Sequence, residues 1–206
     1  GVSAQDVDVV VVGTSTPGRI YPATAVQVQS LIGAERAYAF DVSAACSSFV
    51  YGLELVRGLL RSGAARRALV VAAEYFTAGV DYRDPTFSYF FGDAGAAAVV
   101  EAADLARGKP GWRIVDVRCR SQWSRNIRTG LGGTETLVAA RAAAARGETD
   151  PAPGDAASPW FFQNGPSVYR DVVPLVARET LALLDGHRLT PDDVRLFLFH
   201  QASALM

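Results

Sequence analysis

The strongest fold signal in this sequence is YAFDVSAACSSFVYGLELV, which runs from Tyr38 to Val56. Its first five residues are a short, mostly apolar run of the kind that forms a strand inside a sheet. Small residues flank Cys46 on both sides. After them the apolar positions return with helical spacing, which places Phe49 and Leu53 on one stripe with Val56. The stretch therefore predicts a strand, a tight turn that carries a cysteine, and a helix.

The segments on either side repeat this alternation. VDVVVVG (7–13) and ALVVAAE (68–74) are apolar runs that predict buried strands, and ATAVQVQSLIG (23–33) predicts a helix that stops at Gly33. Strand, helix, strand, helix, strand within the first 75 residues indicates an α/β fold with parallel strands.

The rest of the chain is less regular. FGDAGAAAVVE (91–101) and WRIVDVRCRS (112–121) predict two further strands, and Cys119 is expected in the core of the second. A loose excursion over 129–158 combines a helical part, TLVAARAAAARG, with a loop. A long helix then follows, capped near Ser167, and Pro174 is expected to bend or interrupt it.

Composition limits the classes of function. The chain has 206 residues, half of them apolar, and 20 Lys and Arg nearly balance 21 Asp and Glu, for a net charge of −1. Nucleic acid is therefore not the expected main partner, since phosphate binding needs a basic excess. Two cysteines are too few for a disulfide framework, and neither a signal peptide nor an apolar run long enough to span a membrane is present. We expect a soluble protein of the cytoplasm.

An internal repeat links the two ends of the sequence. VSAQDVDVVVVGTST begins at residue 2, and LTPDDVRLFLFHQAS begins at residue 189. Each copy predicts a short helical turn capped by Ser3 or Thr190, followed by a buried apolar strand. The first strand ends at Gly13 and the second at His200. The repeat predicts two related halves and places a histidine at a strand end, where α/β sheets often carry their sites.

Cys46 and His200 are the candidates for chemistry, although each has a simpler reading. A free cysteine usually only packs, but Cys46 stands at the start of a helix, where the exposed amides and the macrodipole favour a thiolate. His200 could be a satisfied core residue or the base that serves the cysteine. His187 lies in a polar turn, and the Cys and His spacings do not match a metal site. The turns GTSTPG and FGDAGA are weak as phosphate loops.

Taken together, FDVSAACSSFVYGLELVRGLLRSG, ALVVAAE, FGDAGAAAVV and FHQAS resemble the β-ketoacyl-acyl carrier protein synthase III family. The resemblance covers most of the chain. It implies the thiolase fold, with two pseudo-symmetric α/β halves in an αβαβα layering. It also implies an N-terminal half over 1–128, the excursion over 129–158, and the start of the C-terminal half over 159–206, so that the chain is expected to be incomplete at both ends.

The resemblance also implies roles for individual residues. Cys46 matches the nucleophile and His200 the active-site histidine. The implied substrate-binding residues are Tyr21, which would reach the acyl pocket of a neighbouring subunit, Phe91, Asn164 and Gly165. Arg120, Arg125 and Arg128 are candidates for contact with coenzyme A or a carrier protein, against the simpler reading of a solvated basic segment. The family's third active-site residue, an asparagine, would lie beyond Met206, and Ser203 stands where the family most often has asparagine.

The expected activity is acyl transfer without a cofactor. Cys46 would take an acyl group from coenzyme A or acyl carrier protein, and a malonyl-type thioester would then condense with it after losing carbon dioxide, in fatty acid or polyketide biosynthesis. Two alternatives stay open: acyl transfer to a hydroxyl or amine without decarboxylation, and a non-catalytic partner subunit of a heterodimer. A homodimer is the expected assembly, with no membrane partner.

Overall fold

The computed structural model describes residues 1–86, 88–130, 133–147 and 158–202. The chain forms two compact units. Unit 1 comprises Gly1–Ala78 and Phe90–Arg120, and unit 2 comprises Gly79–Tyr89 and Ser121–Met206.

Unit 1 is built on a four-stranded sheet with the order β2-β1-β3-β4. Strands β1 (Val9–Gly13), β2 (Tyr38–Val42) and β3 (Arg67–Tyr75) are parallel, and β4 (Asp93–Glu101) runs antiparallel to β3. The three parallel strands confirm the expected α/β class.

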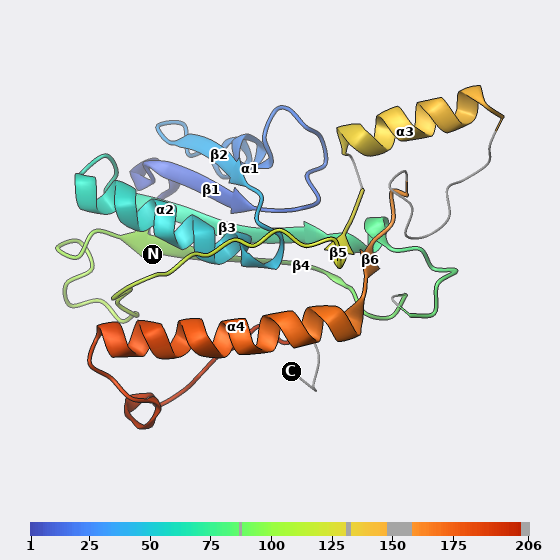
Figure 1. Ribbon diagram of the computed structural model, residues 1–206. Helices are drawn as coiled ribbons and strands as arrows, with labels where there is room; N and C mark the ends of the chain where they lie inside the picture. The colour runs from blue at the N-terminus through green and yellow to red at the C-terminus, as the bar shows by residue number, and fades with distance from the viewer. Residues whose placement is uncertain (87, 131–132, 148–157, 203–206) are drawn as a thin grey trace. The chain divides into compact units, whose positions relative to one another are not determined.

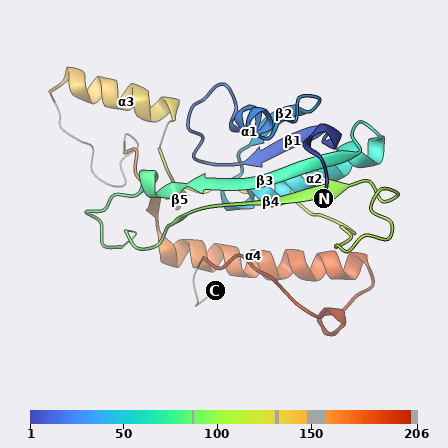
Figure 2. The ribbon, with the colours of Figure 1, turned by 180° about the vertical axis from the view of Figure 1, so that it is seen from behind.

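Helices α1 (Thr24–Ile32) and α2 (Ser48–Ser62) cover opposite faces of this sheet (Figures 1 and 2). Alternate valines of β1 account for this, because successive side chains of a strand point to opposite faces. Val10 and Val12 pack in the cluster that contains α1, while Val9 and Val11 pack in the cluster that contains α2. All four are fully buried, so β1 is the centre of the core.

The predicted end of α1 at Gly33 is correct, and α2 ends in the same way at Gly63. Gly33 and Gly63 follow the last helical residues with φ values of 72° and 77°, in the left-handed region that glycine adopts without steric cost. The predicted stripe of α2 is also correct, since Val56 is buried and Phe49 and Leu53 pack beside it.

Unit 2 contains β5 (Ile127–Arg128) paired with β6 (Phe162–Gln163), and helices α3 (Thr134–Ala145) and α4 (Gly165–Gly186). Helix α4 is capped by the Asn164 side chain, which accepts a hydrogen bond from the Ser167 N–H at 3.2 Å, so the cap, expected near Ser167, lies three residues before it. The helix continues through Pro174 without a break.

Two strand predictions are wrong. Residues 112–121 form no strand, and Cys119, expected in the core, is exposed. Residues 195–200 likewise form no strand and are exposed. The capped turns of the repeat are nevertheless present, as η1 (Ala4–Asp6) and η4 (Pro191–Asp193). An alternating apolar segment becomes a strand only where another strand completes its hydrogen bonds, and in the described residues neither segment has such a partner.

Candidate active site

The nucleophile candidate lies on a short turn at the carboxyl end of β2. Cys46 is the middle residue of the 3₁₀ turn η2 (Ala45–Ser47), which leads directly into α2. Ala45, the residue before it, has a φ of 49°. A residue with a Cβ avoids this region, so the backbone beside Cys46 is strained. Strain of this kind gathers at functional sites, which favours a chemical role for the cysteine over simple packing.

Ser48 holds the strained turn in place. Its hydroxyl accepts a hydrogen bond from the Ala44 N–H at 2.8 Å and donates one to the Ala45 carbonyl at 2.7 Å. The side chain is buried, with 3% of the residue exposed. In the sequence Ser48 is only one of the small residues near Cys46, whereas in the structure its hydroxyl connects the Ala44 N–H with the carbonyl of Ala45, the residue in the left-handed conformation.

The close approach of α2 to β1 depends on Gly13. A Cβ built on Gly13 would lie 2.8 Å from the Ser48 Cβ and 2.9 Å from its carbonyl carbon. The first turn of α2 therefore packs directly on the end of β1. This contact fixes where Cys46 stands relative to the strand ends.

The electrostatics of Cys46 differ from expectation. Burial of the sulfur raises the pKa of the Cys46 thiol, a hydrogen bond with the backbone N–H of Cys46 lowers it, and the negative charge of Glu74 raises it further. The net shift is upward, although the residue as a whole is exposed. The expectation that the helix start favours the thiolate is thus reversed, because desolvation of the charged form outweighs it. A thiol of this kind needs a base to act as a nucleophile near neutral pH.

Glu74 was not recognised from the sequence as a site residue. It is the penultimate residue of β3, and its carboxylate accepts hydrogen bonds from the Ser15 N–H and the Thr16 hydroxyl, both at 2.8 Å. A carboxylate at the last residue of the predicted strand 68–74 is the signal that could have pointed to it.

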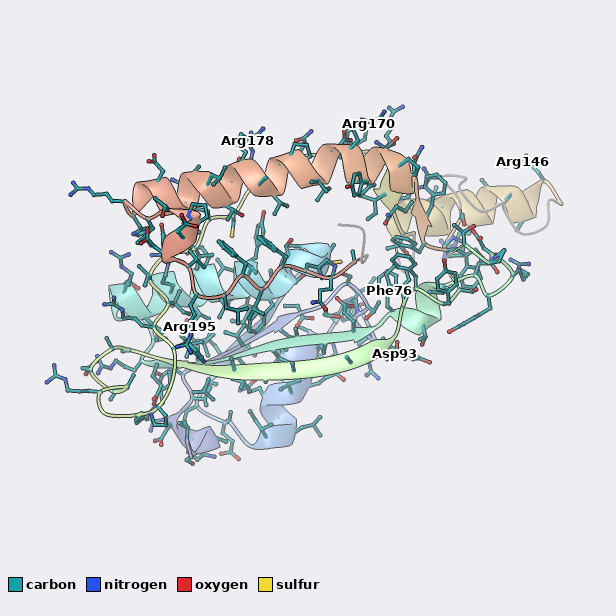
Figure 3. All side chains as sticks on the ribbon, turned by 90° about the horizontal axis from the view of Figure 1, so that it is seen from below. Phe76, Asp93, Arg146, Arg170, Arg178 and Arg195 are labelled. Atoms are coloured by element: carbon teal, nitrogen blue, oxygen red, sulfur yellow. The ribbon has the colours of Figure 1, made fainter. Side chains whose placement is uncertain are left out.

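The aromatic candidates of unit 1 differ in their surroundings. Phe91 contacts Phe76 with ring centroids 4.4 Å apart and Phe90 at 5.9 Å. Phe76 lies close to Asp93, where β3 ends and β4 begins (Figure 3). Tyr21 is 83% exposed. Phe91 is thus part of an aromatic cluster, while Tyr21 presents its ring to the exterior of unit 1.

The three candidate arginines and Gly165 are the remaining candidates. The guanidinium of Arg125 stands 5.3 Å from the Trp123 ring and that of Arg128 stands 4.8 Å from the Phe162 ring. Arg120 is exposed at the end of unit 1. Gly165 is the first residue of α4.

His200 is exposed in unit 2, outside any strand, and its pairing with Cys46 stays a prediction. Ser203 lies outside the described residues. Within the described ranges, no three or more His, Cys, Asp and Glu side chains form a group that could hold a metal ion.

Comparison with known proteins identifies the family. The sequence profile of 3-oxoacyl-[acyl-carrier-protein (ACP)] synthase III matches residues 40–122, which include the Cys46 turn, α2, β3 and β4. β-Ketoacyl-[acyl-carrier-protein] synthase III of Granulibacter bethesdensis is 36% identical over 208 residues, covering 98% of this chain and 58% of its own length. The chain belongs to the β-ketoacyl-acyl carrier protein synthase III family.

Solved structures agree with the sequence matches. β-Ketoacyl-[acyl carrier protein] synthase III of Thermus thermophilus has a TM-score of 0.74 and 28% identity, over 95% of this chain and 55% of that one. The priming β-ketosynthase of the R1128 polyketide pathway has a TM-score of 0.68 and 29% identity, over 94% of this chain and 53% of that one. The expected thiolase fold is confirmed. This synthase III family chain spans 57% of the length of the first curated relatives that it matches.

Proposed function

We propose that this chain carries the nucleophile of a β-ketoacyl-acyl carrier protein synthase, an acyltransferase that forms an acyl-enzyme on Cys46. The observation that supports it best is the strained turn at Ala45, pinned by the buried Ser48, with Cys46 between them. A structural cysteine needs no such backbone, and the chain shares its family with synthases of this name.

In the first step the Cys46 thiol gives its proton to a base, for which His200 is the proposed residue. The sulfur attacks the thioester carbonyl, and backbone N–H groups, that of Cys46 included, stabilise the oxyanion. The carbon–sulfur bond of the donor breaks, and the released thiol of coenzyme A or carrier protein takes the proton. The raised pKa of Cys46 makes a base necessary for this step at neutral pH.

The second step forms the carbon–carbon bond. A malonyl-type thioester loses carbon dioxide, and His200 donates a hydrogen bond to the resulting enolate oxygen. The enolate carbon attacks the acyl carbonyl, and the Cys46 sulfur leaves as the β-keto thioester forms. The R1128 relative, a priming ketosynthase of a polyketide pathway, supports placing this reaction in fatty acid or polyketide synthesis. No cofactor takes part in these steps.

The proposed assembly is a homodimer in the cytoplasm. Strand β2 lies at the edge of the unit 1 sheet, and Ile20 and Tyr21 are 76% and 83% exposed. In the part of the chain that the structure describes, β2 pairs only with β1, and an edge strand and exposed apolar side chains each favour association with a second copy. Among the described helices, none is both long and apolar enough to cross a membrane.

The experiment is intact-protein mass spectrometry after mixing with acyl-coenzyme A thioesters of increasing chain length. We expect a mass increase equal to one acyl group, lost in Cys46→Ala and kept in Cys119→Ser. Cys119 is a matched control because it is the other exposed cysteine of the chain. Absence of an adduct from the wild-type protein with every donor would contradict the nucleophile, and an unchanged activity of Cys46→Ala would favour the scaffold alternative.

A second assay separates condensation from simple transfer. The acylated protein is mixed with malonyl-acyl carrier protein, and carbon dioxide and the β-keto product are measured. Release of both supports condensation. Transfer of the acyl group to a hydroxyl or amine acceptor without carbon dioxide would favour the alternative activity.

A further inference from the structure

The turn that follows β1, GTSTPG (13–18), is held by both neighbouring strands. On one side the Thr14 N–H donates a hydrogen bond to the Val42 carbonyl at the end of β2, at 3.1 Å. On the other side the Ser15 N–H and the Thr16 hydroxyl donate to the two carboxylate oxygens of Glu74 on β3, each at 2.8 Å. A carboxylate that accepts two hydrogen bonds holds them more strongly than a neutral group would.

The same turn is closed by two further bonds. The Thr16 hydroxyl oxygen accepts from the Tyr75 N–H at 2.8 Å, and the Thr16 N–H donates to the Thr14 hydroxyl at 3.1 Å. The Thr16 hydroxyl therefore connects the Glu74 carboxylate with the backbone N–H of Tyr75. The turn between Thr14 and Thr16 is thus fixed by β2 and β3 together.

The strand register places this turn beside the nucleophile. Gly13 pairs with Val42 on one neighbouring strand and with Ala72 on the other, so all three parallel strands end at one edge. Cys46 comes four residues after Val42 and Glu74 two residues after Ala72. The carboxylate is near enough for its charge to act on the Cys46 sulfur.

We propose that Glu74 is a positioning residue for the proposed acyl transfer, whose carboxylate fixes the Thr14–Thr16 turn next to Cys46 and keeps a negative charge beside the sulfur. Its significance for catalysis rests on the proposed function of Cys46. Glu74 does two separable things: its oxygens hold the turn, and its negative charge disfavours the thiolate form of Cys46, so that a base is needed to take the proton.

Three variants separate the two effects. Glu74→Gln removes the charge while its amide oxygen can still accept from the Ser15 N–H. Thr16→Val removes the hydroxyl that joins Glu74 to Tyr75 and leaves the charge in place. Glu54→Gln is the matched control. Burial raises the pKa of the Cys119 thiol, and the negative charge of Glu54 raises it further, as the charge of Glu74 does for Cys46.

The first readout is the pH dependence of alkylation by iodoacetamide, measured for each cysteine by peptide mass. We expect Glu74→Gln to move the midpoint of Cys46 to lower pH and to leave that of Cys119 unchanged. Glu54→Gln is expected to do the reverse. A general loosening of the fold would shift both cysteines, so midpoints that move together, or that do not move, would overturn the proposal.

The second readout is the rate of acylation by acyl-coenzyme A. For Thr16→Val we expect about a tenfold loss, because a small displacement of groups around a reacting atom slows the step, with the alkylation midpoint of Cys46 unchanged. A wild-type acylation rate in Thr16→Val would refute the positioning role. If no acyl donor modifies the wild-type protein, the proposed function fails, whereas the alkylation profiles still decide whether Glu74 acts on Cys46.

Discussion

Replacement of Gly13 by alanine is the sharpest test of how the Cys46 turn is placed. The new Cβ would lie 2.8 Å from the Ser48 Cβ, 2.9 Å from the Ser48 carbonyl carbon and 3.2 Å from the Phe49 nitrogen. Two of these three atoms belong to the backbone of α2, so a side-chain rotation cannot relieve the contact. The start of the helix has to move away from β1.

The magnitude follows from two opposing effects. Overpacking of this kind costs about 1–3 kcal/mol, and the lower backbone entropy of alanine in the unfolded state returns about 0.5–1 kcal/mol. We expect a net loss of about 1–2 kcal/mol in the free energy of unfolding, which lowers the melting temperature by roughly 2–8 °C for a chain of this size. Since Ser48 moves with the helix and pins the Cys46 turn, acylation should slow by about tenfold to a hundredfold.

Gly58→Ala is the matched control. Gly58 lies in the same helix, and nothing stands within 4 Å of a Cβ built on it. Alanine there should raise the free energy of unfolding by about 0.5–1 kcal/mol and leave acylation unchanged. Thermal unfolding and the acyl-coenzyme A assay measure both effects. A Gly13→Ala protein that melts at or above the wild-type temperature and acylates normally would refute the reasoning.

Three further predictions concern side chains of unit 1. Ser48→Ala leaves the half-buried Ala44 N–H without its acceptor and should cost about 1 kcal/mol in urea unfolding, together with slower acylation. Asp41→Ala removes the carboxylate that accepts from the Thr24 and Ala25 N–H groups at 2.8 and 2.7 Å at the start of α1, and should cost about 1 kcal/mol in the same measurement. Hydrogen bonds from Arg67 and Lys109 lower the pKa of Glu101 below its ordinary 4.5, so its contribution to stability is present above that pH and disappears as the pH falls through the lowered value. Between neutral and acid pH, the free energy of unfolding should therefore fall less steeply in Glu101→Gln than in the wild type. Equal slopes of the two curves would contradict the ion-pair effect.

Periodicity was a reliable guide in the part of unit 1 that ends with β4 at Glu101. The valine run of β1, the apolar stripe of α2 and the glycines after both helices are local signals, and local signals suffice where each strand has a neighbour. The same signals failed for residues 112–121 and 195–200, which have strand-like sequences and no strand partner in the described residues. A strand is a property of a pair, and one segment cannot report whether its partner is present.

The candidate site shows the same division. Cys46 could be selected from its small neighbours and its place before a helix, and the family resemblance is confirmed by the comparisons. Glu74 and Ser48 could not be selected from the sequence, because their importance comes from contacts with residues that the sequence does not mark. Glu74 bonds residues 58 and 59 positions earlier in the chain. The direction in which the pKa of Cys46 shifts also depends on how far the sulfur is buried, which no local sequence pattern encodes.

The sequence by itself determined the α/β class, the order of the first five elements and the family, because these depend on periodicity and on short motifs read along the chain. Only the tertiary structure decided what surrounds Cys46: the left-handed residue before it, the serine that pins the turn, the glycine that lets α2 approach β1, and the carboxylate beside the sulfur. Each of these is a contact or a backbone conformation set when strands distant in sequence are brought to one sheet edge. Their hydrogen bonds, burial and charge exist only after folding.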